Sequence, residues 1–425
     1  MTRYAGPRAG RVRGADGRDV RCGADGPGRG TGMERAQRTQ DPADRPDGIP
    51  EEAAGPESPA SRPRLRRPRR QGAEPGPPGS APRRRWPRRA RRTGLALVLL
   101  LLLPVLATQI ALRVNYTGDV ADGTRTRNRD ALWLGHAWID GRKKDADVTA
   151  LAHRLAGTGV RDLYVHAGPL EHDGTLPASA YPRARWLVAA VHRELPGVRV
   201  QAWLGDVLAT EGPDGLRLEL PATRAAIVGS TRAVLDAGFD GAHFDLEPLH
   251  SGDRDYLGLL DALHRETRSR GALLSVAAHQ IDPLPGLHSV FGVLAGHPKW
   301  WSQEFFGQVA RRVDQIAVMS YDTMQQWQST YGGYVAQQTS LALEVTPPTT
   351  DLLMGLPFYH ENRFGHRGAA ETVPAAVRGV RLGLSRTDAA RANFGVALYV
   401  DFAATEADWA AYREGWADRP TTSAS

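Results

Sequence analysis

Eight short apolar segments, each followed by a segment of helical periodicity, repeat along residues 130–417. The predicted strands cover residues 131–138, 160–166, 198–204, 239–247, 272–279, 315–321, 351–358 and 394–400. The predicted helices cover residues 148–155, 183–195, 222–237, 255–269, 301–313, 334–343, 373–384 and 407–416. Eight such units in about 290 residues match a (β/α)8 barrel in number and size. We therefore predict an α/β TIM barrel. A doubly wound open sheet is less favoured, because no glycine-rich phosphate loop follows the first strand.

The fourth predicted strand, residues 239–247, carries titratable side chains along one face. Side chains alternate along a strand, so His243, Asp245 and Glu247 point to one side, and the residues between them are apolar. Carboxylates that are crowded in a semi-buried place push each other's pKa values apart, as acid–base catalysis requires. The alternative is a solvent-facing strand edge with ordinary surface charges, which the apolar flanks disfavour.

Polar or aromatic side chains stand at the end of every predicted strand. They are His136, Trp138, Asp140, His166, Asp206, Asp245, Glu247, His279, Gln280, Tyr321, Asp322, Tyr359, His360, Glu361 and Asp401. The functional site of a TIM barrel lies at the carboxyl ends of its strands. We therefore predict a polar barrel mouth that holds the site.

Four histidines at these strand ends suggest a metal-dependent hydrolase as one hypothesis. They are His136, His166, His243 and His279. Histidines that converge on a barrel axis bind catalytic metals in such hydrolases. However, the first strand lacks the His-x-His pair at which such a site usually begins. We therefore expect neither a metal nor another cofactor.

Four strand motifs together match one known family. They read Asp240-Gly-Ala-His243-Phe-Asp245-Leu-Glu247, Ser275-Val-Ala-Ala278, Met319-Ser-Tyr321-Asp322 and Gly355-Leu-Pro-Phe-Tyr359. In this order, over about residues 130–417, they resemble glycoside hydrolase family 18, the chitinase-like family. The fourth strand of that family reads Asp-x-x-Asp-x-Asp-x-Glu, and three of its four acidic positions are matched here.

The resemblance implies a retaining, substrate-assisted glycosidase that hydrolyses N-acetylhexosamine-containing glycans. Glu247 would be the general acid that protonates the leaving oxygen. Asp245 would orient the 2-acetamido group of the substrate, whose carbonyl oxygen attacks the anomeric carbon, and Tyr321 would hydrogen-bond to that group. The further substrate-binding residues expected are Asp322, Met319, His243, Tyr359, Tyr399, Trp138 and Trp327.

Two positions depart from the family pattern. His243 stands where the family has an aspartate that shares a proton with the next aspartate. Tyr399 stands where the family commonly has a tryptophan that forms the floor of the sugar-binding site. A protonated His243 would hold Asp245 ionised, whereas a neutral one leaves the charge of Asp245 open. A non-catalytic glycan-binding protein on the same barrel is therefore an alternative function.

The first 92 residues differ sharply in composition from the remainder. They contain 23 arginines, no lysine and 11 acidic residues, a net charge of +12, whereas the remainder carries −5. So few apolar residues cannot offset the loss of chain entropy, and we predict disorder for residues 1–92. A misplaced start codon is another explanation for such sequence. The arginine clusters alone do not predict a nucleic-acid partner.

Residues 93–112 carry no charge and follow seven arginines between Arg83 and Arg92. At about 1.5 Å per residue they just span a hydrocarbon core of roughly 30 Å. The positive-inside rule then places the N-terminus in the cytoplasm and the barrel outside it. We predict a transmembrane signal anchor at residues 93–114, a linker at 115–129 and a tail at 418–425. The alternative is a signal peptide cleaved near Ala107 and a secreted barrel.

The expected partners are thus a membrane, through residues 93–112, and an envelope glycan or N-acetylhexosamine oligosaccharide. Cys22 is the only cysteine, so the predicted barrel has no disulfide, thiolate metal site or cysteine nucleophile.

Overall fold

The computed structural model describes residues 88–210, 212–289, 292 and 299–418. The prediction of disorder for the arginine-rich segment falls on residues 1–87 and so lies outside the described residues, as does nearly all of the predicted tail. The described residues form two units, which are separated within helix α2 (Arg88–Asn115) after Thr108.

Helix α2 covers the uncharged segment at residues 93–112. Several of its apolar side chains, including those of Leu100 and Val105, are exposed, and Pro104 lies inside the helix. Among the residues that the structure describes, however, no helix combines the length and the apolar character needed to cross a membrane. The predicted transmembrane anchor is therefore not supported.

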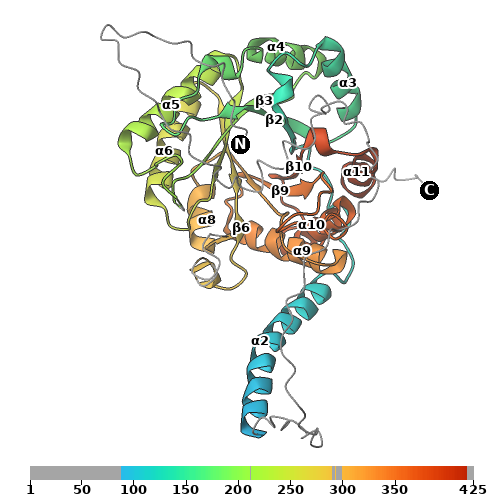
Figure 1. Cartoon of the computed structure of the whole chain (residues 1–425). Helices are drawn as coiled ribbons and strands as arrows, with labels where there is room; N and C mark the ends of the chain where they lie inside the picture. The colour runs from blue at the N-terminus through green and yellow to red at the C-terminus, as the bar shows by residue number, and fades with distance from the viewer. Residues whose placement is uncertain (1–87, 211, 290–291, 293–298, 419–425) are drawn as a thin grey trace, which may run out of the picture. The chain divides into compact units, whose positions relative to one another are not determined.

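Eight parallel strands close into a barrel, around which the helices lie (Figure 1). The strands are β1 (Asp130–Leu134), β2 (Val160–Pro169), β3 (Arg199–Val207), β4 (Gly241–Glu247), β5 (Leu273–Ala278), β8 (Gln315–Val318), β9 (Asp351–Pro357) and β10 (Phe394–Tyr399). The last strand pairs with the first, with Ala397 opposite Ala131. This closure confirms the predicted TIM barrel and shows that the open-sheet alternative was wrong.

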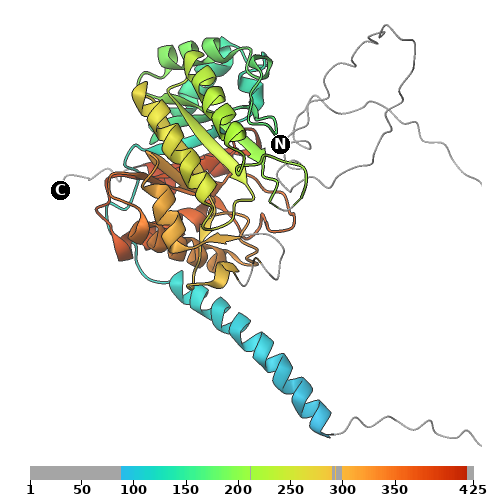
Figure 2. The ribbon, with the colours of Figure 1, turned by 90° about the vertical axis from the view of Figure 1, so that its left-hand side faces the viewer.

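One helix follows each strand, as the periodicity predicted. The helices are α3 (Asp145–Leu155), α4 (Ala184–Glu194), α5 (Pro221–Asp236), α6 (Arg254–Ser269), α8 (Gln303–Ala310), α9 (Gln328–Val345), α10 (Val373–Thr387) and α11 (Glu406–Tyr412). Seen from the side, they run alongside the strands (Figure 2). Local side chains fix some helix starts, since Asp253 and Ser302 accept hydrogen bonds from backbone N–H groups in the first turns of α6 and α8.

The two faces of the strands form two separate apolar clusters. The outward side chains pack beneath the helices in one large cluster, to which Phe244 and Leu246 of β4 contribute. The inward side chains form a second cluster inside the barrel, with Trp133, Trp203 and Tyr399 among its members. The alternation predicted for the fourth strand is therefore present, and the alternative of a solvent-facing strand edge was wrong.

A polar layer lies beneath this inner cluster. The Arg199 guanidinium donates to the buried Asp162 carboxylate at 2.8 Å, and the Gln201 side chain donates to the same carboxylate at 2.9 Å. Gln315 in turn accepts a hydrogen bond from the hydroxyl of Tyr164. Because each of these buried groups has a partner, the layer closes the inside of the barrel below the functional end.

A short parallel sheet that the sequence did not predict follows β5. It pairs β6 (Gln280–Ile281) with β7 (Trp300–Trp301). Trp301 is fully buried, donates to the backbone oxygen of Leu249 at 3.0 Å and contacts Phe305 edge-on. Trp301 is therefore a core residue of this loop region.

Candidate active site

Two carboxyl groups project from the end of strand β4. Asp245 is 5% exposed, and its Oδ2 accepts a hydrogen bond of 3.2 Å from the indole N–H of Trp203 on the neighbouring strand β3. Its other oxygen, Oδ1, is buried and has no hydrogen-bond donor among the described residues. Glu247 is nearer the opening, with 32% of its side chain exposed, and its Oε1 lies 3.8 Å from Nε2 of His279. The predicted catalytic pair therefore stands at the carboxyl end of the barrel.

The surroundings push both carboxyl groups toward protonation, but by different amounts. Burial raises the pKa of Asp245 to about 6, and the hydrogen bond from Trp203 limits that rise. Burial also raises the pKa of Glu247 to about 8, and the charges of Asp245 and Asp322 add to the rise. At pH 7 Asp245 is therefore mostly ionised and Glu247 mostly protonated, which is the division of roles needed by an acid and a charged partner.

His243 does not interact with Asp245 as a cation. Its Nε2 accepts a hydrogen bond of 3.1 Å from the indole N–H of Trp133, and its Nδ1 lies 2.7 Å from the hydroxyl of Ser275. That hydroxyl donates to Gln201, so Nδ1 must be the protonated nitrogen of a neutral ring. Burial lowers the pKa of His243 to about 3, in agreement with this hydrogen-bond pattern. The question that the sequence left open is thus settled in favour of a neutral imidazole.

Three tyrosines pack against one another at the carboxyl end of the barrel. The ring of Tyr321, which follows β8, stacks on that of Tyr399 at the end of β10, with centroids 5.1 Å apart. Tyr359 meets both rings edge-on. A Cβ at Gly355 would lie 2.8 Å from the Tyr321 ring, so only glycine at this position of β9 leaves room for that ring. The predicted residues Tyr321, Tyr359 and Tyr399 therefore meet at one place in the mouth.

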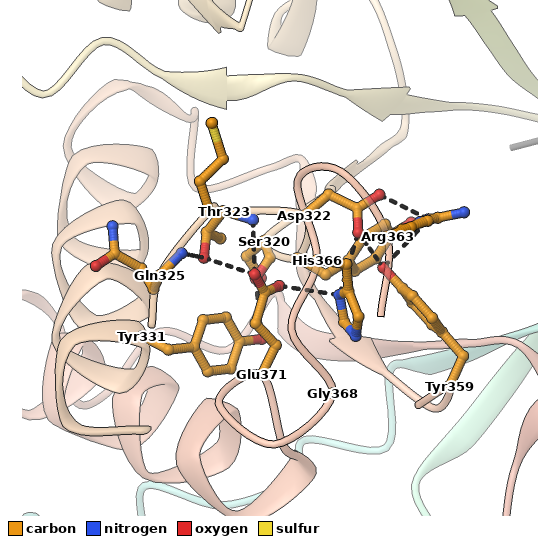
Figure 3. Close-up of polar contacts among 12 residues, drawn as sticks. Ser320, Asp322, Thr323, Gln325, Tyr331, Tyr359, Arg363, His366, Gly368 and Glu371 are labelled. Atoms are coloured by element: carbon orange, nitrogen blue, oxygen red, sulfur yellow. Dashed lines mark hydrogen bonds and ion pairs between the residues drawn. The ribbon is translucent and has the colours of Figure 1, made fainter. Parts of the chain in front are cut away.

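Asp322 is held by three neighbours at the same end of the barrel (Figure 3). The hydroxyl of Tyr359 donates to it at 2.5 Å, the guanidinium of Arg363 donates to it at 2.7 Å, and Nδ1 of His366 lies 3.1 Å away. Burial opposes ionisation of this carboxyl, but these interactions outweigh it and lower its pKa. Asp322 is thus a fixed anion that raises the pKa of Glu247.

Asp322, His366 and Glu371 form the only group within the described residues whose donor atoms could surround a metal ion, all lying within 4.8 Å of one another. Nδ1 of His366 lies 3.1 Å from Asp322 and 3.3 Å from Glu371. Burial opposes the charge of His366, but the two carboxylates prevail and raise its pKa to about 9. A proton on His366 therefore bridges the two carboxylates at neutral pH, and a metal would have to displace it.

The four histidines of the metal hypothesis do not come together as a metal site. His243 is hydrogen-bonded inside the barrel, and Nδ1 of His136 lies 3.0 Å from the backbone oxygen of His166. Burial, with the charge of His136 as a smaller cause, lowers the pKa of His166 to about 3. His279 instead lies beside Glu247.

The remaining predicted residues lie around these groups. Trp138 is buried and donates to Asp401 at 2.7 Å, so it is held in the loop after β1. Met319 is partly buried against the inner aromatic cluster. Trp327 is 51% exposed, and the Arg113 guanidinium lies 4.9 Å from its ring centroid. Their proposed contacts with a substrate stay predictions.

Sequence reasoning missed four residues of this region: Trp203, Arg363, His366 and Glu371. Trp203 could have been found, because it lies two residues after Gln201 and so shares the inward face of β3. The other three lie in the loop after β9, where no periodicity marks side-chain direction. The run of polar and cationic residues at 362–367 was the one available signal.

Comparisons with known proteins gave structural similarities alone. Neither models of known protein families nor curated proteins matched the sequence. A class V chitinase from Pseudomonas fluorescens Pf-5 is similar over 67% of this chain and 98% of its own, with 12% identity and a TM-score of 0.47. A group IV chitinase from Ostrinia furnacalis is similar over 68% and 99%, with 14% identity and a TM-score of 0.46.

The spore cortex-lytic enzyme SleL of Bacillus cereus is similar over 71% of this chain and 76% of its own, with 12% identity and a TM-score of 0.48. Chitinases are thus among the structures to which this chain is similar. The fold itself is established by the closed ring of eight parallel strands.

Proposed function

We propose that this protein is a retaining glycoside hydrolase that cleaves N-acetylhexosamine-containing glycans with the help of the substrate's own acetamido group. One observation carries the proposal. Asp245 and Glu247 stand on one strand at the barrel mouth, and at neutral pH the first is mostly ionised and the second mostly protonated. Cleavage of an acetal bond uses a proton donor, which protonates the leaving oxygen, and an anion, which stabilises the developing positive charge.

The first chemical step uses Glu247 as the acid. Its proton passes to the glycosidic oxygen while the acetamido carbonyl oxygen forms a bond to the anomeric carbon and the glycosidic bond breaks. The positive charge that develops on the acetamido group is stabilised by ionised Asp245. In the second step Glu247, now a carboxylate, takes a proton from water, which attacks the anomeric carbon from the side of the departed group. The bond between that carbon and the acetamido oxygen breaks at the same time, and the acetamido group is restored. Two inversions give overall retention.

The open oxygen of Asp245 favours this route. Oδ1 is buried without a donor among the described residues, so it is free to accept a hydrogen bond from a ligand. The N–H of an acetamido group is such a donor. In this position Asp245 orients the acetamido oxygen toward the anomeric carbon. The hydroxyl of Tyr321, whose ring is buried against that of Tyr399, donates to the same group.

The test is hydrolysis of N-acetylglucosamine oligomers and peptidoglycan fragments by the full chain and its Glu247→Gln variant. General acid catalysis contributes about 10²- to 10⁴-fold, so kcat should fall by that factor on the substrate that is cleaved. Glu344→Gln is the matched control, because Glu344 is an exposed residue near the end of α9. Equal activities of the Glu247→Gln variant and the native protein would contradict the proposal.

Two alternatives predict different results in the same experiment. A non-catalytic glycan-binding protein would bind the oligomers without cleaving them. A metal-dependent hydrolase, for which the convergence of Asp322, His366 and Glu371 is the supporting observation, would lose activity with a chelator and regain it with metal. The proposed mechanism predicts that a chelator leaves cleavage unchanged.

We also propose that the barrel works outside the cytoplasm. The support is the run of seven arginines before the uncharged residues 93–112, a pattern typical of export signals. Fractionation of cells that express the full chain, with protease added to intact and to lysed cells, tests this proposal. Protection of the barrel in intact cells without an outer membrane would contradict it.

A further inference from the structure

The loop after β9 forms a pocket of about 260 Å³ that is lined by Asn362, Arg363, His366 and Arg367. Arg363 and His366 face each other across a tight turn and exchange two backbone hydrogen bonds of 3.1 Å. Residues that are paired in this way project their side chains to the same side. Gly365 within the turn has a φ of 94°, which side-chain-bearing residues rarely adopt. The backbone thus builds a fixed support for two cationic side chains.

The charges that face this pocket do not cancel. Arg363 and protonated His366 balance the carboxylates of Asp322 and Glu371, with which they form ion pairs. Arg367 is exposed and has no acidic partner in the described parts of the chain. Lys299, which donates to the backbone oxygen of Asp322 at 3.3 Å, adds a further positive charge nearby. The pocket therefore has an excess of positive charge.

One buried donor of the pocket is also unused. His366 is 1% exposed, and its Nε2 makes no hydrogen bond with any described residue. Figure 3 shows this nitrogen turned away from both carboxylates, which lie on the side of Nδ1. Nε2 of His366 is thus a nitrogen in the lining of this pocket to which no described residue is hydrogen-bonded.

We propose that this pocket binds an anionic substituent, a carboxylate or a phosphate, that is carried by the glycan substrate. The planar guanidinium groups of Arg363 and Arg367 match the geometry of such oxyanions, and His366 lines the same pocket. The pocket also lies within Coulomb range of Glu247, because Arg363 lowers the pKa of that residue. The link to a glycan rests on the proposed function, whereas the anion site itself does not.

The first experiment compares the affinities of two glycans of equal length in the Glu247→Gln background. One is an N-acetylglucosamine oligomer, and the other carries a carboxylate, as a lactyl ether, or a phosphate on one sugar. Arg367→Gln should lower the ratio of anionic to neutral affinity by about tenfold, as expected for one charge-assisted hydrogen bond. Arg161→Gln should leave the ratio unchanged, because Arg161 is exposed at the amino end of β2. An unchanged ratio in Arg367→Gln would overturn the inference.

The second experiment needs no glycan. The ¹⁵N signal of His366 Nε2 is followed during titrations of the full chain with acetate and with inorganic phosphate. A saturable shift is expected, and the stronger of the two anions identifies the preferred substituent. The shift should weaken in Arg367→Gln but persist in Arg161→Gln. Saturable anion binding without glycan cleavage would refute the proposed function alone, whereas cleavage without anion binding would refute the anion pocket alone.

Discussion

The hydrogen bond from Trp203 to Asp245 gives the sharpest test of the electrostatics of the mouth. Trp203→Phe removes the single donor that the described residues offer to this carboxylate. A hydrogen bond to a charged group is worth about 1.5–3 kcal/mol, and one pKa unit corresponds to about 1.4 kcal/mol. The pKa of Asp245 should therefore rise by about 1–2 units from its value of about 6.

The consequence is a change in the pH profile of kcat/KM. Cleavage requires Asp245 ionised and Glu247 protonated, so the profile should be a bell between about pH 6 and pH 8. In Trp203→Phe the acidic limb of the profile shifts to higher pH by about 1–2 pH units and reaches the basic limb. The maximal value of kcat/KM therefore also falls. Measurement of kcat/KM from pH 4 to 10 on an N-acetylglucosamine oligomer gives both limbs.

Two controls separate this effect from a loss of folding. Trp186→Phe removes an equivalent indole donor at the surface of α4, where Trp186 binds Asp145 at 2.7 Å, and it should leave the profile unchanged. Circular dichroism establishes that Trp203→Phe is folded at each pH, since a smaller ring in the barrel core lowers stability. An acidic limb that stays in place in folded Trp203→Phe would refute the role assigned to Trp203.

Two stability predictions concern the carboxyl groups of Glu247 and Asp130. Folding raises the pKa of Glu247 from 4.5 to about 8, so the folded protein binds more protons than the unfolded chain between these pH values. The melting temperature of the native protein should therefore fall, relative to that of Glu247→Gln, as the pH rises through this window. A parallel pH dependence of the two proteins would contradict the raised pKa. Asp130 accepts hydrogen bonds from Tyr412 and Trp416, so Asp130→Asn should lose about 2–4 kcal/mol of unfolding free energy in urea, whereas exposed Asp214→Asn should lose almost none.

The sequence was sufficient for those features that depend on neighbouring residues. The alternation along residues 239–247 predicted which side chains of β4 face the barrel interior, because the pleat of a strand reverses direction at every residue. The motif at Met319–Asp322 likewise placed Tyr321 and Asp322 at the mouth, because all parallel strands of a barrel end on the same side.

The charge of His243 lay beyond sequence reasoning. It depends on Trp133 and Ser275, which are 110 and 32 residues away along the chain and reach His243 only when β1, β4 and β5 share one barrel. Of the two alternatives for His243, the hydrogen bonds favour the neutral ring, which does not hold Asp245 ionised. Trp203, on the strand beside β4, donates to Asp245 instead.

The sequence by itself determined the barrel and the strand that carries the two carboxyl groups for which we propose a catalytic role, because hydrophobic periodicity and strand alternation are local properties. The tertiary structure alone decided the protonation of Asp245, Glu247 and His243 and assembled the cationic pocket around His366. Burial and long-range pairing set these properties, and both arise only when segments distant in the chain are brought together.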